Sequence, residues 1–228
     1  MEASARTRAP IGLGARLARE LGAKTAVWLG LAVGICVPYF AIQQLAWLPP
    51  RELPATLLDR AVPFAPGWIH AYASVALLVP LAPALAATRD ELVRYARGLA
   101  ALCLPSFLVF LLFPVLGPRP EAAVDVSLYT AIVAVDRPTN SLPSLHAGLT
   151  VYSLLYIDRV FGAGFAPPAR ALVAAGSLVW AGLILYSTLA TRQHGLLDLP
   201  PGALMAFAAH SFAWWGAGEG AAAGRRSA

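Results

Sequence analysis

The sequence predicts an all-α polytopic membrane protein, a bundle of six transmembrane helices whose N- and C-termini both lie in the cytoplasm. Three observations support this fold class. Hydrophobic residues make up 58% of the 228 residues and charged residues only 13%, whereas about a quarter of a soluble domain is charged. Apolar runs long enough to cross a bilayer recur along the chain. Lys and Arg residues concentrate in alternate connections between these runs.

The apolar runs divide the chain into three parts. Residues 1–24 form a cytoplasmic N-terminal segment, residues 25–216 a single membrane domain, and residues 217–228 a flexible tail rich in Ala and Gly. A span needs about 20 mostly apolar residues. Six are expected, at 25–45, 67–87, 98–117, 145–164, 170–190 and 195–215. The connection before the fourth span is the longest, and long ordered loops often carry function.

The positions of the basic residues indicate the orientation. With the N-terminus inside, twelve of the 17 Lys and Arg residues fall on the cytoplasmic side, where an excess is usual. The other five are Arg51, Arg60, Arg119, Arg137 and Arg192. The net charge of +5 would suit a nucleic acid only if it clustered on a soluble face. The charges lie between apolar runs instead, so the expected surroundings are membrane lipids and no nucleic acid.

Three short polar stretches meet at the outer face in this topology. They are FPVLGPRP after the third span, NSLPSLHAG at the start of the fourth, and YSTLATRQHGLLDLPPG between the fifth and sixth. Each comes from a different helix pair, yet all share one side and one depth. We therefore expect them to form one functional site.

The third stretch contains a candidate nucleophile. His194 and Asp198 are four residues apart, and on a helix this spacing puts both side chains on one face. A carboxylate there can accept the proton of one ring nitrogen and leave the other free to attack. Histidine is a competent covalent nucleophile. Pro200 and Pro201 follow directly and are expected to kink the sixth helix.

The second stretch contains a candidate acid and a helix cap. Ser144 is the expected N-cap of the fourth helix, whose first N–H groups would suit a phosphate. His146 lies on the first turn, where it could protonate a leaving group. Arg119 and Arg192 supply planar, permanently charged groups that hold phosphate. Together these groups suit phosphoryl transfer without a metal or another cofactor.

The same residues resemble the signatures of the type 2 phosphatidic acid phosphatase superfamily. PSLH at 143–146 resembles its second signature, and Ser187-x6-His194-x3-Asp198 resembles its third. PRP at 118–120 is similar to the end of its first. The resemblance covers roughly residues 98–215 and implies a six-helix membrane fold. It implies that His194 is the nucleophile, that Asp198 orients it and that His146 is the acid. It also implies that Arg119 and Ser144 bind the phosphate.

Two positions depart from the family pattern. The lysine of the first signature is replaced by Leu112, and the arginine that follows the serine of the third is replaced by Thr188, with Arg192 four residues later. In this form the three stretches resemble the subgroup that includes inositol phosphorylceramide synthase and sphingomyelin synthase. Those enzymes pass a phospho-headgroup between lipids, so the resemblance leaves phosphatase and transferase activity both open.

The predicted function is therefore an integral-membrane phosphatase or phosphotransferase that acts on a lipid phosphate at the outer face through a phosphohistidine. The acceptor would be water or a lipid alcohol. The Ala-, Arg- and Gly-rich composition resembles that of a GC-rich bacterium, which would place the site at the periplasmic face of the inner membrane. Phosphatidic acid, a prenyl diphosphate and a phosphoinositide present the same phosphate, so the residues do not distinguish among these substrates.

Three alternatives compete with this function. An intramembrane serine hydrolase would use Ser144, but LPSLH lacks a glycine-flanked nucleophile turn. A transporter should show helix breaks at matched positions of two halves, and no such match is evident. Two histidines and an aspartate could hold zinc, although the neighbouring arginines disfavour a cation.

Overall fold

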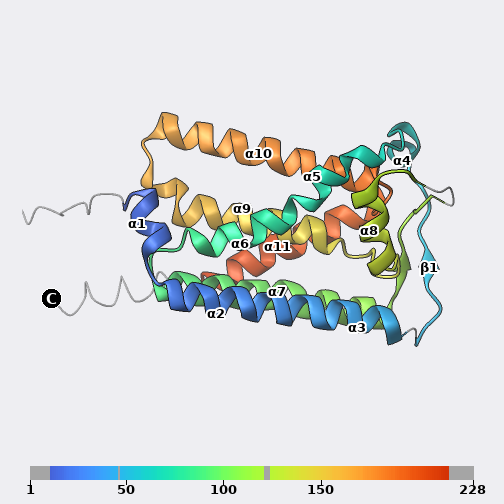
Figure 1. Cartoon of the computed structure of the whole chain (residues 1–228), viewed down its shortest axis with the longest axis horizontal. Coiled ribbons are helices and arrows are strands. Elements are labelled where there is room, and N and C mark those ends of the chain that lie inside the picture. The colour runs from blue at the N-terminus through green and yellow to red at the C-terminus, as the bar shows by residue number, and fades with distance from the viewer. Residues whose placement is uncertain (1–10, 46, 121–123, 216–228) are drawn as a thin grey trace, which may run out of the picture.

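The computed structural model describes residues 11–45, 47–120 and 124–215, which form a bundle of long helices (Figure 1). The short elements β1, α4 and α8 gather at one end of the bundle, and α1 lies at the other. Arg6, Arg8, Arg225 and Arg226, which contribute to the expected orientation, lie outside the described residues. So does the predicted flexible tail at 217–228.

The first half of the chain builds three long helical stretches. Its elements are α1 (Leu13–Ala18), α2 (Leu21–Leu31), a π-helical turn (Ala32–Cys36), α3 (Val37–Leu45), β1 (Arg51–Glu52), α4 (Leu57–Ala61), a 3-10 turn (Pro66–Trp68), α5 (Ile69–Ala73), α6 (Val75–Ala84) and α7 (Arg89–Leu112). The second half builds three more. Its elements are β2 (Val115–Leu116), α8 (Ser127–Val135), α9 (Leu145–Val160), a 3-10 turn (Gly162–Gly164), α10 (Pro167–Ala190), a 3-10 turn (Leu196–Asp198) and α11 (Leu199–Ala213).

Four of these helical stretches are long and apolar enough to cross a membrane. They are Leu21–Leu45, Pro66–Ala84, Arg89–Leu112 and Pro167–Ala190. The chain is therefore a mostly helical protein with several candidate membrane spans. α9 and α11 occupy the expected fourth and sixth spans but have only 16 and 15 residues. The count of six spans and the cytoplasmic position of both termini stay predictions.

α7 begins and ends earlier than the span expected at 98–117. Thr88 caps its start, where the side-chain oxygen accepts a hydrogen bond from the N–H of Glu91. Its end follows from Phe113, which precedes Pro114 and adopts a non-helical conformation. A residue before proline is disfavoured in helical geometry because of a clash with the proline ring.

The kink expected in the sixth helix is wrong. α11 begins at Leu199, so Pro200 and Pro201 occupy its first turn. The first N–H groups of a helix have no partner within it, and the fixed φ of proline suits this position. The prolines therefore help to start the helix instead of bending it.

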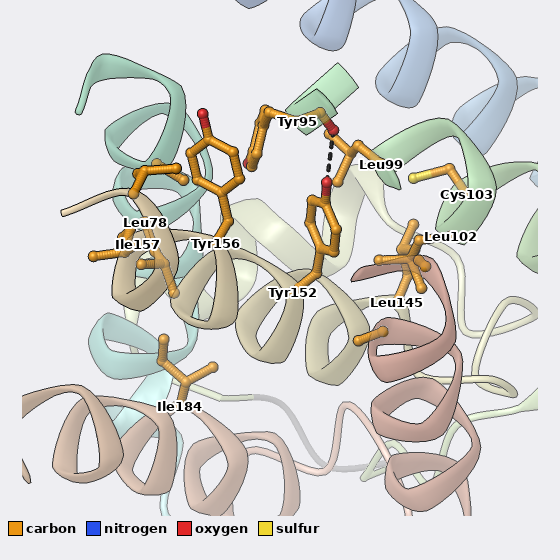
Figure 2. Packing of buried hydrophobic residues seen from close by; sticks show 14 of the residues in the cluster. Leu78, Tyr95, Leu99, Leu102, Cys103, Leu145, Tyr152, Tyr156, Ile157 and Ile184 are labelled. Atoms are coloured by element: carbon orange, nitrogen blue, oxygen red, sulfur yellow. Dashed lines mark hydrogen bonds between the residues drawn. The ribbon is translucent and has the colours of Figure 1, made fainter. Parts of the chain in front are cut away.

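α9 lies at the centre of the bundle, in contact with α6, α7, α10 and α11 (Figure 1). Tyrosines of α7 and α9 fill much of the core (Figure 2). The hydroxyl of Tyr152 donates to the backbone carbonyl of Tyr95 at 2.8 Å. The hydroxyl of Tyr156 donates to the backbone carbonyl of Glu91 at 3.0 Å. Each ring thus buries its apolar surface while its hydroxyl is paired.

The N-terminal ends of α9 and α11 are in close contact. The N–H of Ser144 donates to the carbonyl of Asp198 at 2.9 Å. A Cβ placed on Gly202 would overlap the carbonyl oxygen of Ser144 and stand 3.3 Å from the nitrogen of Gly148. Only glycine fits at position 202, and the contact fixes the start of α9 against the start of α11.

Gly202→Ala is expected to destabilise the protein by about 1–3 kcal/mol, the usual cost of overpacking. The clash involves backbone atoms, so one helix must move. The melting temperature in detergent should fall. Gly176→Ala on α10 is the matched control, because no atom lies within 4 Å of its added Cβ, and its melting temperature should hold or rise. Equal melting of both variants would contradict this packing.

Candidate active site

His194 lies in the loop between α10 and α11. Arg192 adopts a left-handed backbone conformation (φ 56°) just after the helix ends. The N–H groups of Gln193 and His194 then both donate to the carbonyl of Thr188, at 3.0 and 3.2 Å. These bonds fold the loop back onto the end of α10 and leave His194 only 8% exposed.

The expectation that His194 and Asp198 share one helix is wrong. His194 belongs to the loop, and Asp198 closes a single 3-10 turn before α11 begins. The turn still brings Oδ2 of Asp198 within 3.7 Å of Nδ1 of His194. The pair is therefore placed by a loop and a turn, not by one helical face.

Ser141, which was not predicted from the sequence, joins this pair. Its hydroxyl donates to Oδ2 of Asp198 at 2.5 Å and lies 3.3 Å from Nδ1 of His194. Its carbonyl oxygen is 3.1 Å from the same nitrogen. Because a carbonyl oxygen can only accept, Nδ1 carries the ring hydrogen and donates it to Ser141. A neutral ring then leaves Nε2 unprotonated, as a nucleophilic histidine requires.

A short parallel backbone pairing positions Ser141. Val115 of β2 donates to the carbonyl of Thr139, and the N–H of Ser141 donates to the carbonyl of Val115, both at 3.1 Å. β1 pairs with the same strand in a parallel register. Since β2 leads directly into the PRP stretch, this pairing also brings Arg119 to the site. The only sequence signal for Ser141 is its place in the turn-rich NSLPS segment.

His146 lies on the first turn of α9, as predicted. Its ring stacks on Tyr72, with centroids 3.8 Å apart and an angle of 15° between the planes. Its Nε2 donates to the carbonyl of Tyr72 at 2.7 Å, so Nδ1 is the nitrogen available to a ligand. The ring centroid lies 6.4 Å from that of His194. One phosphoryl group could contact both rings.

Ser144 is the N-cap of α9, which confirms that prediction. Its hydroxyl oxygen accepts a hydrogen bond from the N–H of Ala147 at 3.2 Å, and the residue is fully buried. It does not line the cleft described below. The structure therefore assigns Ser144 a capping contact, and its contact with phosphate stays a prediction.

Arg119 is held by an ion pair with Asp136. Nη1 donates to the carbonyl of Asp136, and Nη2 lies 3.0 Å from its Oδ2. The other carboxylate oxygen of Asp136 accepts hydrogen bonds from Tyr39 and Gln43 of α3. This network fixes the direction of the guanidinium, whose Nε has no partner within the described ranges.

Arg192 connects the loop to α4. Its Nη1 donates to the carbonyl of Asp59 and its Nη2 to that of Val62. The carboxylate of Asp59, another residue missed in the sequence, accepts from the N–H of Leu196 at 2.8 Å and from Thr56. Hydrogen bonds from Arg192 and Leu196 thus hold the loop of His194 against α4 and the residue that follows it.

The Asp59 carboxyl is kept ionised at neutral pH. Burial alone would raise its pKa, but hydrogen bonds from Thr56 and Leu196 and the charge of Arg192 outweigh burial and hold the pKa below its usual range. A lowered pKa stabilises the folded state above the ordinary carboxyl range. The contribution is lost as the pH falls through the lowered pKa, so this contact is complete at physiological pH.

A cleft of about 580 Å³ opens beside the histidine site. This volume lies within the range of small-ligand pockets. Its charged lining residues are Glu52, Asp59, Arg60, Arg119, Arg192 and Asp198. Gly195 and Asp198 form its border toward His194. The structure therefore brings His194, Asp198 and His146 together and places both predicted arginines on the adjoining cleft.

Comparison with known proteins agrees with this arrangement. No curated protein and no solved structure matches the chain. A family model described as the PAP2 superfamily matches residues 40–212, from within α3 to the last turn of α11. The match includes all six predicted site residues and about three quarters of the chain. The chain belongs to the PAP2 superfamily.

Proposed function

We propose that this protein is an integral-membrane phosphatase or phosphotransferase that takes the phosphoryl group of a lipid phosphate onto His194. Membership of the PAP2 superfamily suggests phosphatase-type activity on lipid phosphates in a membrane protein. The observation that carries the proposed mechanism is the contact between Nδ1 of His194 and the carbonyl oxygen of Ser141. Nδ1 carries the hydrogen of this contact, so Nε2 is free to attack.

In the first half-reaction, Nε2 of His194 attacks phosphorus in line with the ester oxygen of the lipid. A P–N bond forms while the P–O bond breaks. His146 enters this step with hydrogens on both ring nitrogens, the second taken from the phosphate monoanion, keeps the one on Nε2 bonded to the carbonyl of Tyr72, and gives the one on Nδ1 to the departing oxygen. The lipid alcohol leaves, and the His194 ring becomes positively charged. Asp198 stabilises this charge through the hydroxyl of Ser141. Arg119 and Arg192, which both line the cleft, offset the charge on the phosphoryl oxygens.

In the second half-reaction, the P–N bond breaks. A water molecule gives its proton to His146 and attacks phosphorus, which releases inorganic phosphate and restores both histidines. In a transferase the same position is taken by the hydroxyl of a lipid alcohol. The scheme needs no metal ion, because the guanidinium groups supply the positive charge.

We place the site at the periplasmic face of a bacterial inner membrane. Arg16 and Lys24 lie in or near α1, and Arg89 and Arg94 lie at the start of α7, at the end of the bundle opposite β1 and α4 (Figure 1). An end rich in Lys and Arg normally faces the cytoplasm. The site lies at the other end.

A serine hydrolase is disfavoured by the hydrogen bonds of both candidate serines. The hydroxyl of Ser144 caps α9 and is fully buried. The hydroxyl of Ser141 donates to Asp198, and the ring nitrogen nearest to it already carries a hydrogen. That nitrogen cannot act as the base for Ser141.

Release of phosphate from lipid phosphate monoesters in detergent micelles tests the proposed function. The panel should include phosphatidic acid and a prenyl phosphate, assayed with and without a diacylglycerol or ceramide acceptor. Release without an acceptor would establish a phosphatase, and transfer only with an acceptor a transferase. The absence of both reactions from the whole panel would contradict the proposed function.

Ser141→Ala is expected to lower kcat on the order of 10- to 100-fold, because a hydrogen bond to a charged group contributes about 1.5–3 kcal/mol. The backbone carbonyl still fixes the tautomer of His194, so KM should change little. Steady-state kinetics check this. Ser211→Ala, at an exposed position on α11, is the matched control and should behave as wild type. A normal kcat in Ser141→Ala would remove the serine from the mechanism.

A further inference from the structure

Six buried polar side-chain atoms have no hydrogen-bond partner within the part of the chain that the structure describes. Two of them belong to His210 and Trp214, near the C-terminal end of α11. The other four are Nε of Arg119, the hydroxyl of Tyr129 and both amide atoms of Gln193. Leaving a buried polar group unpaired costs about 1–3 kcal/mol, and such groups are rare. These four atoms include both amide atoms of Gln193, which directly precedes His194, and they indicate a ligand.

The three residues are close to one another. Burial raises the pKa of the Tyr129 hydroxyl, and the charge of Arg119 and a weak hydrogen-bonding contact with the side chain of Gln193 offset part of this rise, so both groups lie near the hydroxyl. A Cβ on Gly117 would stand 2.7 Å from the carbonyl oxygen of Gln193, so the PRP stretch lies directly on the loop. Tyr129 and Gln193 are only 3% and 4% exposed.

The cluster also reaches the side of the site where the leaving group departs. Tyr129 packs with Tyr72 and Ile69 in one small apolar cluster. Tyr72 in turn stacks on the ring of His146, the proposed acid. Tyr129 therefore lies between Arg119 and the side of the site where His146 protonates the alcohol oxygen.

The chemistry of these atoms narrows the class of ligand. Nε of Arg119 is a donor, a tyrosine hydroxyl is both donor and acceptor, and a glutamine amide offers two donors and one acceptor oxygen. Exchanging the two amide atoms of Gln193 leaves this set of donors and acceptors the same. An ionised phosphate offers acceptor oxygens almost alone. A ligand that pairs the whole set needs a hydroxyl donor beside its phosphate.

We propose that Gln193 and Tyr129, together with Nε of Arg119, bind the alcohol side of the substrate and select phosphate esters that carry a free hydroxyl near the ester oxygen. The inference rests on the proposed function, since it assumes that a lipid phosphate occupies the histidine site. A protein with this preference would bind phosphate esters of polyols more tightly than phosphate esters of simple chain alcohols, such as prenyl phosphates. A site built to bond a hydroxyl discriminates strongly against an analogue that lacks it.

The test compares two ligands that differ in one hydroxyl. They are 1-oleoyl-glycerol 3-phosphate, which has a free hydroxyl at C2, and its 2-deoxy analogue. Binding of each is measured by titration calorimetry to the His194→Ala protein in micelles, so that no turnover is needed. The hydroxylated ligand should bind at least about tenfold more tightly. Adding Gln193→Leu, or Tyr129→Phe as an independent variant, should reduce this preference toward unity.

The controls separate binding from folding. Leucine replaces an unpaired amide with an apolar group of similar shape, so Gln193→Leu should melt at the same temperature or higher. Gln44→Leu at an exposed position of α3 should keep the full preference. Equal affinity for both ligands in the parent protein would overturn the inference, as would a preference that survives both variants. Phosphate release by the wild type, measured separately, reports on the proposed function alone.

Discussion

Replacing His194 with alanine is expected to abolish phosphate release, with kcat reduced by a factor on the order of 10⁴ or more, as for the loss of other covalent nucleophiles. The variant keeps the loop, because the backbone bonds to Thr188 do not involve the side chain. It loses the bond from Nδ1 to Ser141, which contributes about 1 kcal/mol to stability. The measurement is release of phosphate from the best lipid substrate of the panel, with melting temperature recorded in parallel.

The control for this variant is another histidine at the same end of the bundle. His70 is exposed, and its ring makes one hydrogen bond within the described chain, to the carbonyl of Gly67. His70→Ala should retain activity within about twofold, as is usual for surface substitutions that touch no special feature. Activity of His194→Ala near the wild-type level would show that the phosphoryl group never resides on this residue.

Asp198→Asn is expected to lower kcat on the order of 10²- to 10⁴-fold while KM changes little. The carboxylate of Asp198 is buried and accepts hydrogen bonds from the hydroxyl of Ser141 and the N–H of Gly195. An amide keeps the shape but removes the negative charge that stabilises His194 once it is phosphorylated. The loss should appear in kcat because that charge develops only during the reaction.

Stability measurements separate this effect from simple unfolding. Asp198→Asn should cost about 1–3 kcal/mol, the range for weakening a buried hydrogen bond to a charged group. Asp158→Asn breaks an exposed ion pair with Arg170 and should cost no more than about 1 kcal/mol without loss of kcat. A kcat for Asp198→Asn within a few-fold of wild type would contradict the charge-stabilising role.

Much of the fold follows from local sequence signals. Apolar runs predict the long helices, and Ser144 before an apolar run predicts the start of α9, because both depend on residues close in the chain. The end of α7 was predicted five residues too late, since Phe113 is apolar and only the proline after it ends the helix. The kink expected at Pro200 and Pro201 is wrong for a similar reason, because these prolines start α11. Spacing alone does not tell a proline that starts a helix from one that bends it.

The site was predicted in part, and the misses share one cause. His194, Asp198 and His146 stand in recognisable motifs, whereas Ser141 acts through a contact with a residue 57 positions away. Asp59 meets Leu196 across 137 positions. Gln193 and Tyr129 become notable only because their buried polar atoms lack partners. Contacts between residues so far apart in the sequence depend on how the loops fold over the end of the bundle, which no local pattern specifies.

The most direct test of the account is to find where the phosphoryl group goes. The protein is mixed with a substrate that carries a radiolabelled phosphoryl group, quenched in alkali within milliseconds, and digested for peptide mapping. The account predicts an alkali-stable, acid-labile label on His194, lost in His194→Ala and retained in His70→Ala. Label on Ser141 or Ser144, or turnover without any labelled protein, would contradict the phosphohistidine mechanism.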